Sequence, residues 1–173
     1  FECRSMTQQG FRPVFMIIGV ILFVLGAQII SSFLVSLLSA AFPKEIAKYT
    51  AMLKRSGLAG DIPPLMVIYS AVLGPISEEL AFRGLSMGYF KKSMTFAWAN
   101  ILQALLFGLI HGNSMQFVYA FLLGLLFGYI AHKTGSLLVT IILHICFNSC
   151  SFIIEARFPH ALNGGAIMAF AIL

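Results

Sequence analysis

Charged side chains are scarce in this sequence of 173 residues: only 10% are Asp, Glu, Lys or Arg, whereas 60% are hydrophobic. Soluble domains carry about 25% charged residues, so this chain lacks the polar surface that a water-soluble globule needs. The 11 basic residues exceed the 6 acidic ones by only 5, and they stand in short segments between apolar runs. This pattern argues against a nucleic-acid partner and predicts a multi-pass integral protein of a plasma or inner membrane.

Cysteines are also few. Cys3, Cys146 and Cys150 make no disulfide framework, and the last two lie one helical turn apart in an apolar run, where we expect them to pack. The sequence shows no series of short alternating segments of the kind that forms a transmembrane β-barrel, and no internal repeat. We therefore predict an all-α fold, a polytopic bundle of transmembrane helices.

Long apolar runs set the organisation of the chain, since about 20 apolar residues are needed to span a bilayer. They predict five full spans, at residues 13–42, 64–90, 94–111, 115–132 and 136–154. The chain begins with Phe1 rather than Met and stops within the apolar run AIMAFAIL, so we expect a fragment with a truncated sixth span. The predicted units are residues 1–62 (first span and interfacial segment), 63–155 (catalytic bundle) and 156–173 (loop and start of the further span).

Two local patterns refine this picture. In segment 43–61, Ile46, Tyr49 and Leu53 share a face opposite three basic residues, which is typical of a helix lying in the headgroup plane; an ordinary connecting loop is the alternative. In the fourth span, Gly124 and Gly128 have the small-xxx-small spacing that allows helices to approach closely.

The stretch GPISEELAFRG places Glu78, Glu79 and Arg83 inside the second span. An intramembrane carboxylate or Arg costs about 2.5–3.5 kcal/mol on insertion scales, so these side chains need partners or a wet cavity. Glu79 and Arg83 are four residues apart and about 40° apart around a helix, which predicts an ion pair. Glu78 points elsewhere, so its partner must come from another helix. A purely structural ion network is the alternative interpretation.

Three more polar residues recur deep in later spans: His111, His144 and Asn148. With Glu78 they can converge on one pocket, where Glu78 and His111 hold and deprotonate a water molecule. His144 and Asn148, one turn apart, would donate hydrogen bonds to a developing oxyanion. A single intramembrane histidine is often only a hydrogen-bonding link between helices, so the hypothesis depends on the four residues occurring together.

The motifs EELAFR, FGLIH and HICFN, in this order on three helices, resemble those of the CPBP family of intramembrane proteases. That family comprises type II CAAX prenyl endopeptidases and bacteriocin-processing or immunity-type proteins, and the resemblance covers about residues 63–155. It implies an intramembrane endopeptidase with Glu78 as catalytic glutamate, His111 as water-activating histidine, and His144 and Asn148 as oxyanion-stabilising residues. Glu79, Arg83 and Phe107 belong to the same motifs, and we interpret them as supporting the site.

The resemblance leaves the metal open. The family has been described as metalloproteases, and Glu78, His111 and His144 could bind Zn²⁺ through one carboxylate and two imidazoles. The sequence has no HExxH motif, however, and a metal-free glutamate mechanism fits the same residues.

The leading hypothesis is therefore a peptidase that hydrolyses a peptide bond near the membrane surface. Its substrate would be a CAAX-type prenylated protein or a small leader or bacteriocin-like peptide. A non-catalytic bacteriocin self-immunity or scaffold protein is the main alternative. A proton-coupled carrier is a third, because buried Glu and His also serve proton relays, but the missing inverted repeat counts against it.

Overall fold

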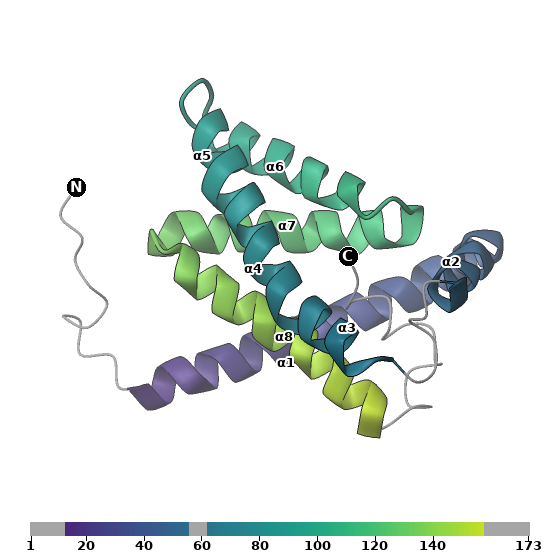
Figure 1. Cartoon of the computed structure of the whole chain (residues 1–173). Helices are drawn as coiled ribbons and strands as arrows, with labels where there is room; N and C mark the ends of the chain where they lie inside the picture. The colour runs from purple at the N-terminus through teal and green to yellow at the C-terminus, as the bar shows by residue number, and fades with distance from the viewer. Residues whose placement is uncertain (1–12, 56–61, 158–173) are drawn as a thin grey trace.

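The molecule is a bundle of helices, seen in the computed structural model in Figure 1. The structure describes residues 13–55 and 62–157, and within these ranges it contains helices and no strand. The all-α fold expected from the composition is confirmed. Most of the large apolar side chains of the first helix face outward, with Ile29 and Phe33 each 70% exposed, as befits a helix bounded by lipid.

The first two helices are α1 (Pro13–Ala41) and α2 (Pro43–Arg55). Helix α2 has an acidic residue, Glu45, in its first turn and two basic residues in its last turn, an arrangement that interacts favourably with the helix dipole at both ends. Its Tyr49 and Leu53 are buried in the protein core. The described part of segment 43–61 is thus a helix rather than a loop, and this part of its apolar face packs on protein.

Residues 64–90 form one irregular helix. Its successive turns are α3 (Pro64–Ile68), η2 (Tyr69–Leu73), α4 (Gly74–Glu78), η3 (Glu79–Ser86) and α5 (Met87–Phe90), and both η segments are π-helical. In these wider turns an N–H bonds to the carbonyl five residues earlier, as Gly74 does to Tyr69 and Met87 does to Phe82. Such turns recur at functional sites; here one precedes the turn that ends at Glu78, and the other begins at Glu79.

Helices α6 (Phe96–Ile110) and α7 (Ser114–Thr134) form an antiparallel hairpin. Gly112, at φ +69°, and the N-cap Asn113 make the turn between them. Gln103 donates a hydrogen bond of 2.8 Å to the Gly124 carbonyl. The close approach of two backbones predicted for this spacing occurs at Gly124, whereas Gly128 makes room for the side chains of Asn100 and Gln103. A Cβ added to Gly124 would lie 3.0 Å from Ala104.

Helix α8 (Leu137–Arg157) follows after Gly135, which closes α7 in the left-handed conformation at φ +63°. Buried Gln28 of α1 donates hydrogen bonds to the Phe147 carbonyl (2.7 Å) and to the Ser151 hydroxyl (2.6 Å) of α8. These bonds fix the two helices against each other.

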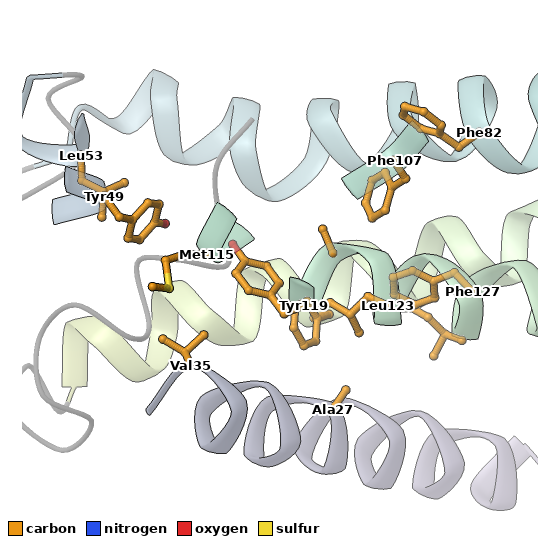
Figure 2. Packing of buried hydrophobic residues seen from close by; sticks show 13 residues of the cluster. Ala27, Val35, Tyr49, Leu53, Phe82, Phe107, Met115, Tyr119, Leu123 and Phe127 are labelled. Atoms are coloured by element: carbon orange, nitrogen blue, oxygen red, sulfur yellow. The ribbon is translucent and has the colours of Figure 1, made fainter. Parts of the chain in front are cut away.

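The apolar core runs along the bundle (Figure 2). At one end Tyr49 and Leu53 of α2 lie near Met115 and Tyr119 of α7, and towards the other end Phe107 of α6 belongs to the same buried cluster. The core therefore joins α2 to the part of the bundle that carries the polar residues.

The count of five full spans is not exact. Four helices of the described residues are long and apolar enough to cross a membrane, at Phe15–Ala41, Pro64–Phe90, Ser114–Thr134 and Leu137–Ile154. The span predicted at 94–111 corresponds to α6, whose 15 residues extend only about 22 Å. It is shorter because the turn before Phe96 and the Gly112 turn take residues from both ends. The predicted start of a sixth span lies outside the described residues.

Replacing Gly124 by leucine should destabilise the α6–α7 hairpin, because the added atoms would collide with the Ala104 backbone. We expect a loss of about 1–3 kcal/mol, the usual cost of overpacking, measured as the free energy of unfolding in detergent. Gly26→Leu is the matched control, since a Cβ at Gly26 meets nothing within 4 Å. Equal loss in both variants would contradict the close approach.

Candidate active site

The polar residues singled out in the sequence come from three neighbouring parts of the bundle. Glu78 ends α4 and Glu79 and Arg83 lie on η3; Phe107 and His111 are at the end of α6; His144 and Asn148 lie on α8. All are buried except His111, which is half-buried. None of them faces the outer, apolar surface.

Glu79 and Arg83 form the predicted ion pair. Arg83 Nη1 lies 2.9 Å from Glu79 Oε1, and both side chains are fully buried. The guanidinium also stacks over the Phe107 ring, with Cζ 4.3 Å from its centroid, and lies 5.4 Å from that of Phe127. Two aromatic faces and a carboxylate thus compensate a cation that has left water.

His144 connects the two carboxylates. Its Nδ1 lies 2.9 Å from Glu79 Oε1, and its Nε2 lies 3.6 Å from Glu78 Oε2. Because an ionised carboxylate can only accept, Nδ1 carries the proton and donates it to Glu79. This bond fixes the ring and directs Nε2 towards Glu78. The described groups therefore form a chain from Arg83 through Glu79 and His144 to Glu78.

Among the described residues, no cation of its own helix lies within ion-pair distance of Glu78. Its partner is His144 of α8, so it comes from another helix, as the helical geometry predicted. Its other oxygen, Oε1, lies over Gly74, where an added Cβ would be 3.7 Å away. The two adjacent glutamates thus have different surroundings. Glu79 is neutralised by Arg83, and Glu78 is not.

Asn148 is held by an irregularity of the helix opposite it. Its Nδ2 donates a 3.0 Å hydrogen bond to the Ser70 carbonyl. The Gly74 N–H bonds instead to Tyr69, and Pro75 has no N–H, so the Ser70 carbonyl lacks its usual main-chain donor. Asn148 supplies the missing donor and is oriented by it.

Phe107 is the aromatic centre of the site. Its ring makes edge-to-face contacts with His111 and His144, with centroids 5.1 and 6.0 Å apart. His111 Nδ1 lies 2.7 Å from the Phe107 carbonyl, so this nitrogen carries the proton and Nε2 is left for another partner. No hydrogen bond or ion pair joins His111 to Glu78 within the described ranges; their shared water molecule stays a prediction.

The metal alternative fits this geometry poorly. Among residues 13–55 and 62–157, no three His, Cys, Asp or Glu side chains converge in a way that could hold a metal ion. The bond from His144 Nδ1 to Glu79 leaves Nε2 free, so this bond is compatible with a metal and the poor fit rests on the missing convergence alone. Glu78, His111 and His144 are thus not arranged as a zinc set among the described residues; the zinc alternative stays a hypothesis, and we derive no chemical step through a metal.

A sequence profile of the family described as type II CAAX prenyl endopeptidase Rce1-like matches residues 60–150, just over half of the chain. The chain belongs to this family. The matched range contains every residue of the candidate site described above. Together with the apolar helices, membership establishes an integral, multi-pass membrane protein.

One curated relative is a protein of Bacillus subtilis (strain 168) named "Putative membrane peptidase YdiL". It is 28% identical over 92 residues, which are 53% of this chain and 38% of that protein. The match thus spans well under half of the relative's length. No solved structure significantly matches the chain.

Sequence reasoning missed two residues that build the site. Ser70 contributes only a carbonyl, which no side-chain pattern reveals. Thr140 is fully buried beside Glu79, and its hydroxyl donates a 2.9 Å hydrogen bond to the Leu137 carbonyl; its position four residues before His144, on the same helical face, was a signal that could have found it.

Arg83→Met should strongly destabilise the protein, because it leaves the buried Glu79 carboxylate without its cation. We expect a loss of about 3–5 kcal/mol in the free energy of unfolding in detergent. The double variant Glu79→Gln, Arg83→Met should recover much of this loss. Lys48→Met, which removes the cation of the exposed Glu45–Lys48 pair, is the control and should have little effect. An Arg83→Met variant as stable as that control would contradict the structural role of the pair.

Proposed function

We propose that this chain is the catalytic part of an intramembrane endopeptidase that hydrolyses a peptide bond near the membrane surface with water activated by Glu78. The observation that carries the proposal is the position of His144 between two buried carboxylates, only one of which is neutralised by an arginine. Membership of a family of prenyl endopeptidases and a relative named as a membrane peptidase support it.

Glu78 is the general base in this mechanism. An ionised carboxylate with no tight ion pair can accept a proton from water, whereas Glu79 is committed to Arg83 and His144. Two adjacent carboxylates with different environments allow such a division of roles. His111 completes the water site through Nε2, since its Nδ1 is fixed on the Phe107 carbonyl.

His144 and Asn148 are the oxyanion donors. His144 donates from both ring nitrogens only as the imidazolium, and in that form Glu78, Glu79, Arg83 and His144 together carry no net charge. Asn148 donates one N–H of its amide to the Ser70 carbonyl, and its second N–H can donate to the oxyanion. Donors fixed in advance stabilise the developing charge without reorganisation.

The reaction balances without a further reactant. The water oxygen attacks the carbonyl carbon while its proton moves to Glu78, and the carbonyl oxygen becomes the oxyanion. Collapse of this intermediate breaks the C–N bond, and the proton held by Glu78 passes to the leaving nitrogen. The products are a carboxylic acid and an amine, and no cofactor is consumed.

The substrate would be a CAAX-type prenylated protein or a small leader or bacteriocin-like peptide, met at the surface of the lipid bilayer. Both classes bring a peptide bond to a membrane. The proposal involves no nucleic acid, because the few basic residues do not form the dense patch that such binding requires.

Glu78→Gln and His111→Ala should each abolish cleavage of a prenylated CAAX peptide and of an unprenylated leader peptide in proteoliposomes. The first removes the base, and the second removes the group that positions the water. His132→Ala, an exposed histidine at the far end of α7, is the matched control and should cleave as the wild type does. Adding a chelator to the wild-type assay tests the zinc alternative, and we expect no loss of activity.

A non-catalytic immunity or scaffold function predicts a different result. Full biological activity in both Glu78→Gln and His111→Ala would overturn the peptidase proposal and favour that alternative. Circular dichroism of each variant in detergent must show a folded bundle for the comparison to hold.

Asn148→Ala should lower kcat by about 10²–10³, the usual effect of losing one oxyanion donor, with a smaller change in KM. Cys146→Ala, on the same helix and half-buried, is the control and should keep kcat. Steady-state cleavage rates of the two purified variants decide the point, and an unchanged kcat in Asn148→Ala would remove this residue from the mechanism.

A further inference from the structure

A cavity of about 320 Å³ lies between α2 and the turn that joins α6 to α7. It is near the end of the bundle where α1 ends and α7 begins (Figure 1). The site described above does not use it. Its lining residues are Glu45, Lys48, Tyr49, Met52, Gly112, Asn113, Ser114 and Met115.

The walls of this cavity combine an apolar floor with a neutral polar rim. Tyr49 and Met115 are almost fully buried and lie close together in Figure 2. At the rim, Lys48 Nζ is 2.6 Å from Glu45 Oε1, and the Ser114 hydroxyl donates to Glu45 at 3.1 Å. The bond with Lys48, and to a smaller extent the bond with Ser114, holds the pKa of Glu45 below its usual value. The ammonium and the carboxylate cancel, so the rim selects no charged group.

The cavity lies beside the turn that follows His111. Gly112, which lines it, directly follows His111 in the chain. Asn113, also in its lining, donates a 3.0 Å hydrogen bond to the His111 carbonyl. One turn therefore forms a wall of the cavity and holds the backbone of His111.

We propose that this cavity is a substrate subsite that binds one or two uncharged residues of an internal peptide segment next to the scissile bond. The inference rests on the proposed peptidase function. The volume is at the lower end of that of small-molecule pockets, about 300–1,000 Å³, which suits a short stretch of peptide. A terminal carboxylate fits less well, because Glu45 already occupies the only lysine of the lining and adds a negative charge.

The first test measures binding without turnover. A photoreactive benzoylphenylalanine replaces Met52, which lines the cavity, or the exposed Ala51 beside it, in the Glu78→Gln protein in proteoliposomes. Each protein is irradiated with a biotinylated prenylated CAAX peptide and with a biotinylated unprenylated leader peptide. We expect cross-linking from position 52, competed by excess unlabelled peptide, and little from position 51.

Cross-linking from neither position, or equally from both, would overturn the subsite. This outcome is independent of the cleavage assay. If the wild type cleaves neither peptide, the peptidase proposal fails, while cross-linking from position 52 would still establish a peptide-binding cavity.

The second test is kinetic. Met52→Trp fills the cavity and should raise KM by about tenfold or more while kcat changes little, the signature of lost ground-state binding. Ala51→Trp places the same ring on the exposed side of α2 and should leave both constants unchanged. An unaltered KM in a folded Met52→Trp variant, or a similar rise in Ala51→Trp, would also overturn the proposal.

Discussion

The structure depends on neutralising a cation inside an apolar bundle. Arg83 is fully buried, and only Glu79 lies within ion-pair distance of it among the described residues. Removing either partner would leave an uncompensated charge, so the two side chains act as a unit. Phe107 and Phe127 cover the guanidinium, which explains why a motif of charged residues needs aromatic neighbours from other helices. Through His144 the same pair also sets the geometry of the candidate site, because Glu79 is the acceptor that orients the imidazole.

A second constraint is the irregular backbone of the 64–90 helix. Pro75 removes one main-chain donor and the adjoining π-helical turn redirects another, so the Ser70 carbonyl is available to a side chain. In a regular helix this carbonyl would be satisfied internally and Asn148 would lack its anchor. The Ser70 carbonyl, which has no main-chain donor in its own helix, thus accepts the hydrogen bond that fixes Asn148 of α8. The same helix carries Glu78, Glu79 and Arg83, so one helix contains both the backbone distortion and the charged residues of the candidate site.

Local periodicity made part of this site predictable. The Glu79–Arg83 pair follows from four-residue spacing alone, and the need for a partner of Glu78 on another helix follows from the same geometry. The role of Ser70 could not be predicted, because it depends on a missing backbone hydrogen bond rather than on a side chain. The length of α6 was overestimated for a related reason: apolar composition continues through the residues that turn the chain, whereas the helix ends where Gly112 takes a positive φ. Composition gives the class of fold, and turns and backbone defects decide its details.

The contrast between Glu78 and Glu79 connects the structural and chemical parts of the molecule. A base must exchange protons, and a residue that holds an arginine in an apolar interior must keep its charge. One carboxylate cannot satisfy both demands. In adjacent positions of a helix the two side chains necessarily point in different directions, so one can be committed to Arg83 while the other faces His144 from the opposite side of the imidazole. A single histidine lies between the two carboxylates. The ion pair that stabilises the bundle therefore also positions the group that faces the proposed base.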